Sequence, residues 1–95
     1  MPPLQIDFED GFNNDTVIVR ADGQELWRQD NVTTNLAANI AAVAHLVVPP
    51  GAQIEIAVPT RTLRAGERVN TPYLEVQLTQ DQLVLRPTDE LPTHL

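Results

Sequence analysis

Residues 53–58 read Gln-Ile-Glu-Ile-Ala-Val, the cleanest alternation of polar and apolar side chains in this 95-residue chain. The two isoleucines and the valine fall on one face of an extended chain, and the other three residues fall on the opposite face. This period of two predicts a β-strand with one buried face. Pro49-Pro50-Gly51 before the run and Pro59 after it are turn-forming or strand-ending residues, so the strand has clear limits.

Similar short runs occur on both sides of this segment. Asp22-Gly23 joins two of them, and such a pair predicts a hairpin because a type I′ turn needs positive φ at both central positions. Turn residues separate the other runs at spacings typical of antiparallel sandwiches. We therefore expect an all-β fold, a small antiparallel β-sandwich of about seven or eight strands. Besides residues 53–58, the strands are expected at residues 4–8, 16–21, 24–29, 42–48, 61–64, 73–79 and 82–86.

Residues 32–48 support two interpretations. Leu36, Ile40, Val43 and Val47 recur at helical spacing, whereas the apolar run that ends at Pro49 resembles a strand. We expect a short helical turn or loop near residues 35–41 and a strand at 42–48. The choice between helix and strand for residues 35–46 stays open at this stage.

The number and spacing of these expected strands are similar to those of immunoglobulin-like sandwiches. The chain has no cysteine, and therefore lacks the paired cysteines and intervening tryptophan of true immunoglobulin domains. The resemblance concerns architecture and transfers no functional residue. A chain of this length is expected to form one domain, here residues 1–87, followed by a flexible C-terminal tail at 88–95.

The charge balance argues against nucleic acids and membranes as partners. Thirteen carboxylates outnumber six arginines, no lysine is present, and the formal net charge is -7. Such a chain is repelled by phosphate backbones and by anionic lipid surfaces. The longest apolar stretch, residues 36–48, is shorter than the roughly 20 residues needed to cross a bilayer.

The residue inventory also argues against an enzyme or a nucleotide cofactor. The chain contains no serine and no cysteine, and its four glycines are isolated in turns rather than grouped as in phosphate-binding loops. His45 lies in an apolar run, where we expect a half-buried imidazole bonded to backbone, and His94 lies near the C-terminus. The N-terminal residues lack a basic region followed by an apolar one, so we expect a cytoplasmic protein.

An acidic segment at residues 7–15 is the candidate metal site. Carboxylates and amides are dense there, and Ca²⁺ takes six to eight oxygen ligands. The segment lacks the regular spacing of an EF-hand loop, so a solvated polar loop with Asx turns is the competing interpretation. The four candidate ligands are Asp7, Glu9, Asp10 and Asp15.

Two further features are candidate interface residues. Trp27 is either a large core side chain or an exposed anchor for a partner, since tryptophan is enriched at interface centres. Arg61, Arg64 and Arg68 cluster in sequence and could bind an acidic loop, although surface pairing with nearby glutamates is the stronger interpretation.

These observations predict a non-enzymatic module that works by protein contact, either by self-association into a homo-oligomer or by docking to another protein through an edge strand. An open sandwich presents unpaired backbone groups at its edges, and an added strand can bind them. The alternative is a calcium-dependent ligand-binding module that uses the acidic loop at residues 7–15.

Overall fold

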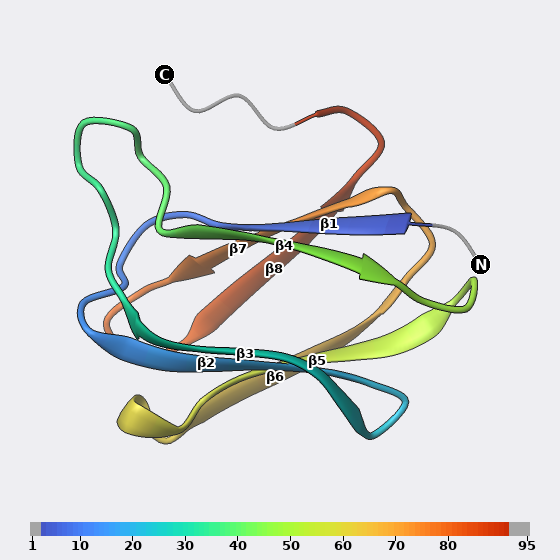
Figure 1. Ribbon diagram of the computed structural model, residues 1–95, viewed down its shortest axis with the longest axis horizontal. Coiled ribbons are helices and arrows are strands. Elements are labelled where there is room, and N and C mark those ends of the chain that lie inside the picture. The colour runs from blue at the N-terminus through green and yellow to red at the C-terminus, as the bar shows by residue number, and fades with distance from the viewer. Residues whose placement is uncertain (1–2, 92–95) are drawn as a thin grey trace.

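The computed structural model describes residues 3–91, and these residues form eight β-strands and one short 3-10 helix. Figure 1 shows the strands in two layers. The elements in chain order are β1 (Pro3–Phe8), β2 (Asp15–Ala21), β3 (Gln24–Val32), β4 (Ala42–Val47), β5 (Ala52–Val58), η1 (Pro59–Arg61), β6 (Leu63–Val69), β7 (Tyr73–Leu78) and β8 (Leu83–Thr88).

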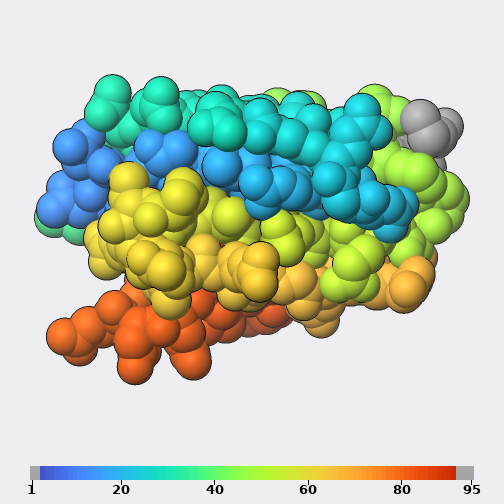
Figure 2. Space-filling view, turned by 90° about the horizontal axis from the view of Figure 1, so that it is seen from below, coloured from blue at the N-terminus to red at the C-terminus, as the bar shows by residue number. Residues whose placement is uncertain are grey.

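The strands form two four-stranded sheets. Sheet A has the order β4-β1-β7-β8, and sheet B has the order β3-β2-β5-β6. The sheets face each other in a sandwich-like arrangement, with sheet A above sheet B in the view of Figure 1. Strand β3 contacts β4 at one side of the sandwich, and β6 contacts β8 at the other. Figure 2 views the molecule from the side of sheet B, whose strands run across the face in coloured bands. The all-β prediction is confirmed.

The expectation of purely antiparallel sheets is wrong for sheet A. Sheet B is antiparallel throughout, but β1 and β7 of sheet A run parallel, with Gln5 beside Tyr73 and Phe8 beside Val76. Alternation along a strand shows which face is buried, but not which distant strand lies beside it or in which direction. The hairpin signals in this chain concern neighbouring strands only, so they could not reveal the parallel pair.

The core lies between the sheets and is mostly aliphatic. The predicted inward residues of β1, β5 and β7 are all buried, including Ile6, Ile54 and Leu74 at 0% exposure. Phe8 adds an aromatic centre, with its ring edge-on to Phe12 at a centroid distance of 5.8 Å. Two layers closed over a shared apolar core account for the stability of so short a chain.

The predicted turns occur where the sequence placed them. Asp22 and Gly23 have φ values of 49° and 87°, as the hairpin between β2 and β3 requires. Gly51 has a φ of 72° and follows Pro49-Pro50, so it reverses the chain between β4 and β5. This second turn combines prolines that restrict φ with a glycine that tolerates the left-handed region.

Residues 35–41 form a hydrogen-bonded turn rather than a helix, and a strand follows. The Asn39 N–H donates to the Asn35 carbonyl at 2.7 Å, and Asn35 also bridges Ile40. The Asn35 side chain accepts the Ala37 N–H at 3.0 Å, which caps the turn locally. The apolar residues at helical spacing do not pack as a helix face against the core, so they form only this one turn. The strand expected at 42–48 is confirmed as β4.

The strand expected at residues 61–64 is misplaced. Pro59 begins η1, which runs to Arg61, and Thr62 then takes a left-handed conformation with a φ of 56°. The strand starts only at Leu63 and continues through Gly66 to Val69. Thr62 therefore reverses the chain where the sequence suggested an extended segment, and Ala65-Gly66, beyond the expected end at residue 64, lies inside β6.

Strand β8 continues beyond the expected end at Arg86. Pro87 lies opposite Leu74 and Thr88 lies opposite Tyr73. Proline fits here because β8 is an edge strand, whose outer side needs no ladder donor. Thr88 therefore belongs to the sheet, and residues 92–95 of the expected tail lie outside the described residues. Within the described part of the chain, no helix is long and apolar enough to span a membrane.

Candidate functional site

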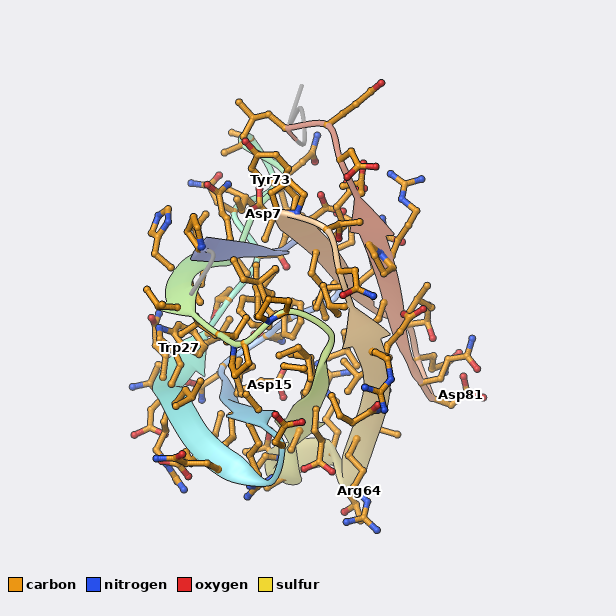
Figure 3. The ribbon with its side chains drawn as sticks, turned by 90° about the vertical axis from the view of Figure 1, so that its right-hand side faces the viewer. Asp7, Asp15, Trp27, Arg64, Tyr73 and Asp81 are labelled. Atoms are coloured by element: carbon orange, nitrogen blue, oxygen red, sulfur yellow. The ribbon has the colours of Figure 1, made fainter. Side chains whose placement is uncertain are left out.

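The acidic segment is divided between the two sheets. Asp7 lies on β1 of sheet A, whereas Asp15 begins β2 of sheet B, and both are labelled in Figure 3. Asp7, Glu9 and Asp15 are buried, while Asp10 is exposed in the connecting turn. Among residues 3–91, no three acidic or histidine side chains come close enough together to hold a metal ion. The four candidate calcium ligands are thus not gathered into one site.

Asp15 instead anchors the 9–15 loop to η1. Its carboxylate accepts hydrogen bonds from the Asn13 N–H at 2.8 Å, the Thr60 hydroxyl at 2.9 Å and the Arg61 Nε at 3.1 Å. Burial alone would raise the pKa of Asp15, but the hydrogen bonds from Arg61, Asn13 and Thr60 together lower this pKa below its ordinary value. Asp15 therefore acts as an ionised structural acceptor.

Arg61 and Thr34 complete the fastening of this loop. Arg61 also donates from Nη2 to the Gly11 carbonyl at 3.2 Å. The Thr34 hydroxyl donates to the Glu9 carbonyl at 2.6 Å and accepts the Phe12 N–H at 3.1 Å. The loop is therefore tied to η1 on one side and to the β3–β4 connection on the other, which favours the structural interpretation of its polar residues.

A row of buried carboxylates on the outer face of sheet A escaped the sequence analysis. Glu75 lies beside Asp7 across the parallel β1–β7 pair, and Glu9 follows β1 on the same face. Gln5 donates to Asp7 at 2.8 Å, and Gln77 donates to Glu9 at 3.2 Å. Detecting this row from sequence required the parallel pairing, since only that pairing brings Glu75 beside Asp7.

Arg86 of β8 completes the row by pairing with Glu75. Its Nε donates to Glu75 Oε1 at 2.8 Å, and its Nη2 donates to the same oxygen. The hydrogen bonds to Glu75 raise the pKa of the Arg86 guanidinium above its ordinary value. Like Asp15, Glu75 serves as an acceptor, and its bonds with Arg86 join β7 to β8.

The three clustered arginines do not form one cationic patch. Arg61 is bound to Asp15, and Arg68 donates to the Gly51 carbonyl at 2.8 Å. Arg64 extends from β6 at the periphery of the molecule (Figure 3). Arg64 and Arg68 are separated by four residues of one strand, or about 13 Å. Their proximity in sequence is therefore not proximity around a single ligand.

Trp27 faces the core rather than solvent. Its ring stacks on Phe8, with centroids 5.2 Å apart and an interplanar angle of 11°, and it lies opposite the buried Val19. Leu26, the alternate neighbour, is 39% exposed. Trp27 is therefore a partly buried side chain that covers the core, and it is not an exposed anchor for a partner.

Arginines lie beside the apolar residues on the outer face of sheet B. Ile18 and Ala57 point outward, but they are only 4% and 8% exposed. Arg28 lies opposite Ile18, and Arg64 lies opposite Ala57. Long arginine stems cover apolar surface while their charged ends stay in water. This face offers solvent a polar layer instead of an apolar docking patch.

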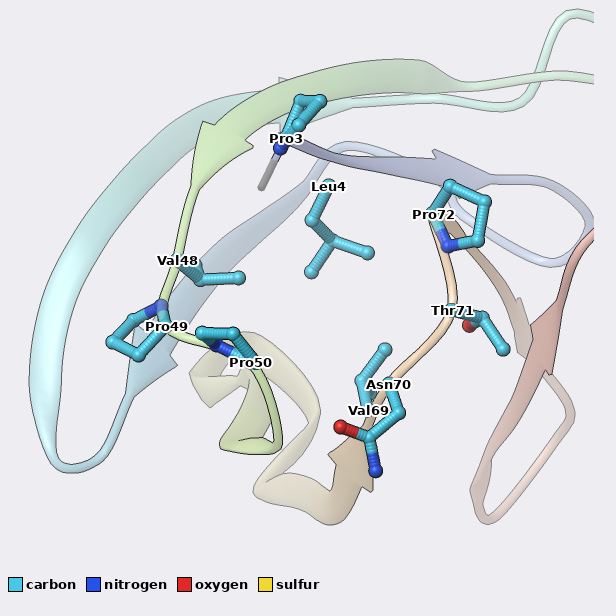
Figure 4. A pocket seen from close by; sticks show the side chains of 9 residues that line it. All are labelled: Pro3, Leu4, Val48, Pro49, Pro50, Val69, Asn70, Thr71 and Pro72. Atoms are coloured by element: carbon cyan, nitrogen blue, oxygen red, sulfur yellow. The ribbon is translucent and has the colours of Figure 1, made fainter. Parts of the chain in front are cut away.

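A hollow of about 220 Å³ lies at one end of the sandwich (Figure 4). Its walls come from the start of β1, the β4–β5 turn and the β6–β7 connection. Leu4 forms part of its apolar lining together with Val48 and Val69, and four prolines surround them. No acidic, basic or histidine side chain is among the described residues lining this hollow, so the described walls contain no general acid or base.

The strand at the free edge of sheet A, β4, is the most distinctive surface. The other three edge strands contain charged side chains: β3 has Glu25, Arg28 and Asp30, β6 has Arg64, Glu67 and Arg68, and β8 has Arg86 beside Pro87. The six residues of β4, Ala-Val-Ala-His-Leu-Val, contain neither charge nor proline. Charge, proline and bulges are the usual protections of sheet edges, and β4 lacks the first two.

The outward side chains of β4 are in contact with solvent. Val43 is 38% exposed and Val47 is 58% exposed, and His45 between them is exposed as well. The expectation of a half-buried His45 is therefore wrong, because alternation puts Ala44 and Leu46 inward and His45 outward. The absence of charged residues from this strand could have been read from the sequence, since residues 42–48 contain no Asp, Glu or Arg in a chain rich in them.

Comparison with protein-family models, curated proteins and solved structures finds no match to this chain.

Proposed function

We propose that this protein is a non-enzymatic interaction module that binds an extended segment, from another protein or from its own kind, as an added strand along β4. The observation that carries this proposal is the free, uncharged edge of sheet A. An added strand gains affinity from main-chain hydrogen bonds and specificity from alternate side chains, so it needs no catalytic groups.

The rest of the surface supports this choice. The outer face of sheet B is covered by charged side chains, with Arg20 bound to Glu55 at 2.8 Å and Arg28 bound to Glu25 at 2.9 Å. The two apolar surfaces described above are the β4 edge and the hollow at the end of the sandwich. Between them, only β4 offers a row of backbone groups that can determine how a partner lies.

The proposal includes protein partners in the cytoplasm and excludes nucleic acids and membranes, for the reasons of charge given above. It also includes an immunoglobulin-like architecture for the sandwich, which the number of strands favours. We do not extend the proposal to calcium, since within residues 3–91 the acidic side chains of the 7–15 segment are divided between sheets and Asp15 is bound to Arg61.

An NMR titration tests the proposal without assuming any natural partner. The ¹⁵N-labelled protein is mixed with a capped, uncharged peptide of alternating valine and threonine. We expect chemical-shift changes and new exchange protection at Val43, His45 and Val47. The matched control is His45→Pro, which removes one edge donor. Binding that ignores this substitution, or shift changes confined to β8, would refute strand addition at β4.

A further inference from the structure

We propose that the strand bound at β4 is the β4 of a second copy of this chain, paired antiparallel about a two-fold axis at His45. This inference rests on the proposed function, because it names the occupant of the same edge. It predicts one continuous eight-stranded sheet across two molecules, formed from two copies of sheet A.

The backbone groups of β1 are directed alternately toward β7 and toward β4. Gln5 donates its N–H to the Pro72 carbonyl at 3.0 Å, and Glu9 donates to the Val76 carbonyl at 2.8 Å, so these residues face β7. Successive residues in a strand direct their backbone groups to opposite sides. The alternate residues of β1 therefore face β4. The Phe8 carbonyl accepts the N–H of Ala41, which directly precedes β4, at 2.7 Å, so this carbonyl is directed to the β4 side.

The register between β1 and β4 shows which β4 residues direct their backbone groups toward β1. Leu4, Ile6 and Phe8 lie opposite Leu46, Ala44 and Ala42 respectively. Those three β4 residues direct their backbone groups toward β1, so the remaining three direct theirs away from the sheet. No strand among residues 3–91 pairs with that outer side. The outward residues are Val43, His45 and Val47.

This outward set of residues is symmetric. His45 is its midpoint, so an antiparallel second copy can place His45 opposite His45 and Val43 opposite Val47. All three outward residues of each copy are then used, giving about six backbone hydrogen bonds. A shift by two residues leaves one outward residue unpaired on each copy. The edge is therefore most complementary to itself in this one register.

Charge also favours a second copy. Two molecules with a net charge of -7 repel each other, so they can approach closely only where charge is absent. Among the described strands, β4 is the one sheet edge whose sequence contains no Asp, Glu, Lys or Arg. The side chains that meet in the proposed register are Val43 and Val47, both exposed in the single chain. A partner segment rich in Arg or Asp would find no matching charge on this strand.

The surface area buried between the two β4 strands determines how stable the dimer is expected to be. A single pair of six-residue strands buries less surface than the roughly 1,200 Å² of a standard stable interface. We therefore expect a transient dimer whose population rises with protein concentration. Antiparallel pairing also brings the residues before β4 of one copy beside the Pro49-Pro50 turn of the other, which extends the contact at both ends.

Single cysteines test the register directly, because the chain has none of its own. Facing residues in a hydrogen-bonded pair have Cα atoms about 5.5 Å apart, within the range of a disulfide. We expect His45→Cys to form a covalent dimer on mild oxidation, at least about tenfold faster than Leu26→Cys on the charged β3 edge. Val43→Cys mixed with Val47→Cys should also cross-link, whereas Val43→Cys alone should not.

Sedimentation of the wild-type chain and of Val47→Lys completes the test. We expect the wild type to form dimers as concentration rises and the lysine variant to remain monomeric, with unchanged circular dichroism. Equally fast cross-linking of the Leu26→Cys and His45→Cys variants, or faster cross-linking of Val43→Cys alone than of the mixture, would overturn the register. A wild type that stays monomeric while the valine–threonine peptide still binds β4 would overturn self-pairing but keep the proposed function. If the wild type stays monomeric and the peptide does not bind β4, self-pairing and the proposed function are both wrong.

Discussion

Strands β3 and β4 lie one above the other at the same side of the sandwich, yet their edges differ in character. β3 exposes Glu25, Arg28 and Asp30 along its length, while β4 exposes two valines and a histidine. Both need attachment to the core, which β3 gains through Trp27 on Phe8 and β4 through its ladder with β1. Under the proposed function, charge protects the β3 edge against added strands, and the absence of Asp, Glu, Lys and Arg leaves the β4 edge available.

The largest effect is expected from Phe8, whose ring stacks on Trp27 of β3. Phe8→Ala removes a fully buried ring that contacts both Phe12 and Trp27, and it should lower the free energy of unfolding by about 3–5 kcal/mol. Urea unfolding followed by far-UV circular dichroism measures this, since Trp27 fluorescence itself will change. Phe8→Leu is the matched control and should cost much less. A loss below about 1 kcal/mol in the alanine variant would contradict the packing described.

Two proline substitutions sharpen the comparison within β4 itself. Ala44→Pro removes an N–H that faces β1 and should destabilise the protein by about 3 kcal/mol. His45→Pro removes an N–H that faces away from the sheet, so it should cost roughly 1 kcal/mol or less while preventing strand addition. Thermal unfolding of the two variants gives the comparison. Equal destabilisation would mean that the assigned backbone directions are wrong.

Asp15→Asn tests the hydrogen bonds that attach the 9–15 loop to η1. It should cost roughly 1–3 kcal/mol at neutral pH, because the buried side chain loses the negative charge that pairs with Arg61. The folded pKa of Asp15 is below its unfolded value, near 3.9, so the extra stability of the wild type is fully present above that value. The stability difference between wild type and variant should therefore stay constant from about pH 7 to about pH 5 and shrink as pH falls below about 4. A difference that grows in acid would contradict the assignment.

The smallest effect is expected from the charges of β3. Arg28→Gln breaks an exposed pair with Glu25 and should leave the unfolding midpoint within experimental error. Replacing Glu25, Arg28 and Asp30 together by threonine should instead increase self-association, measured by light scattering, because the second edge loses its protection. A triple variant that is less stable but no more associated would show that these charges serve folding and do not guard the edge.

Much of the fold followed from local patterns in the sequence. Alternation located β1, β5 and β7 and their buried faces, and Asp22-Gly23 located the hairpin. Thr62 defeated the prediction of β6, because threonine seldom adopts positive φ and nothing nearby signals that it does so here. The β1–β7 pairing was also out of reach, since it joins segments that lie far apart in the chain through side chains that alternate identically.

The candidate site was less predictable than the fold, for a related reason. Which strand forms an edge depends on the order of strands in the sheet, and residues 42–47 give no local sign of that order. The sequence could show that these residues are uncharged, but only the sheet order shows that their outer side is open. Trp27 and the arginines attracted attention through residue type, and the structure assigns them to core packing, ion pairs and coverage of sheet B.

Amide hydrogen exchange of β4, measured residue by residue in dilute solution, tests the central claim most directly. We expect the amides of Ala44 and Leu46 to be protected, and those of Val43, His45 and Val47 to exchange quickly in dilute solution and more slowly as protein concentration rises. Uniform protection along β4 in the dilute chain would contradict an open edge.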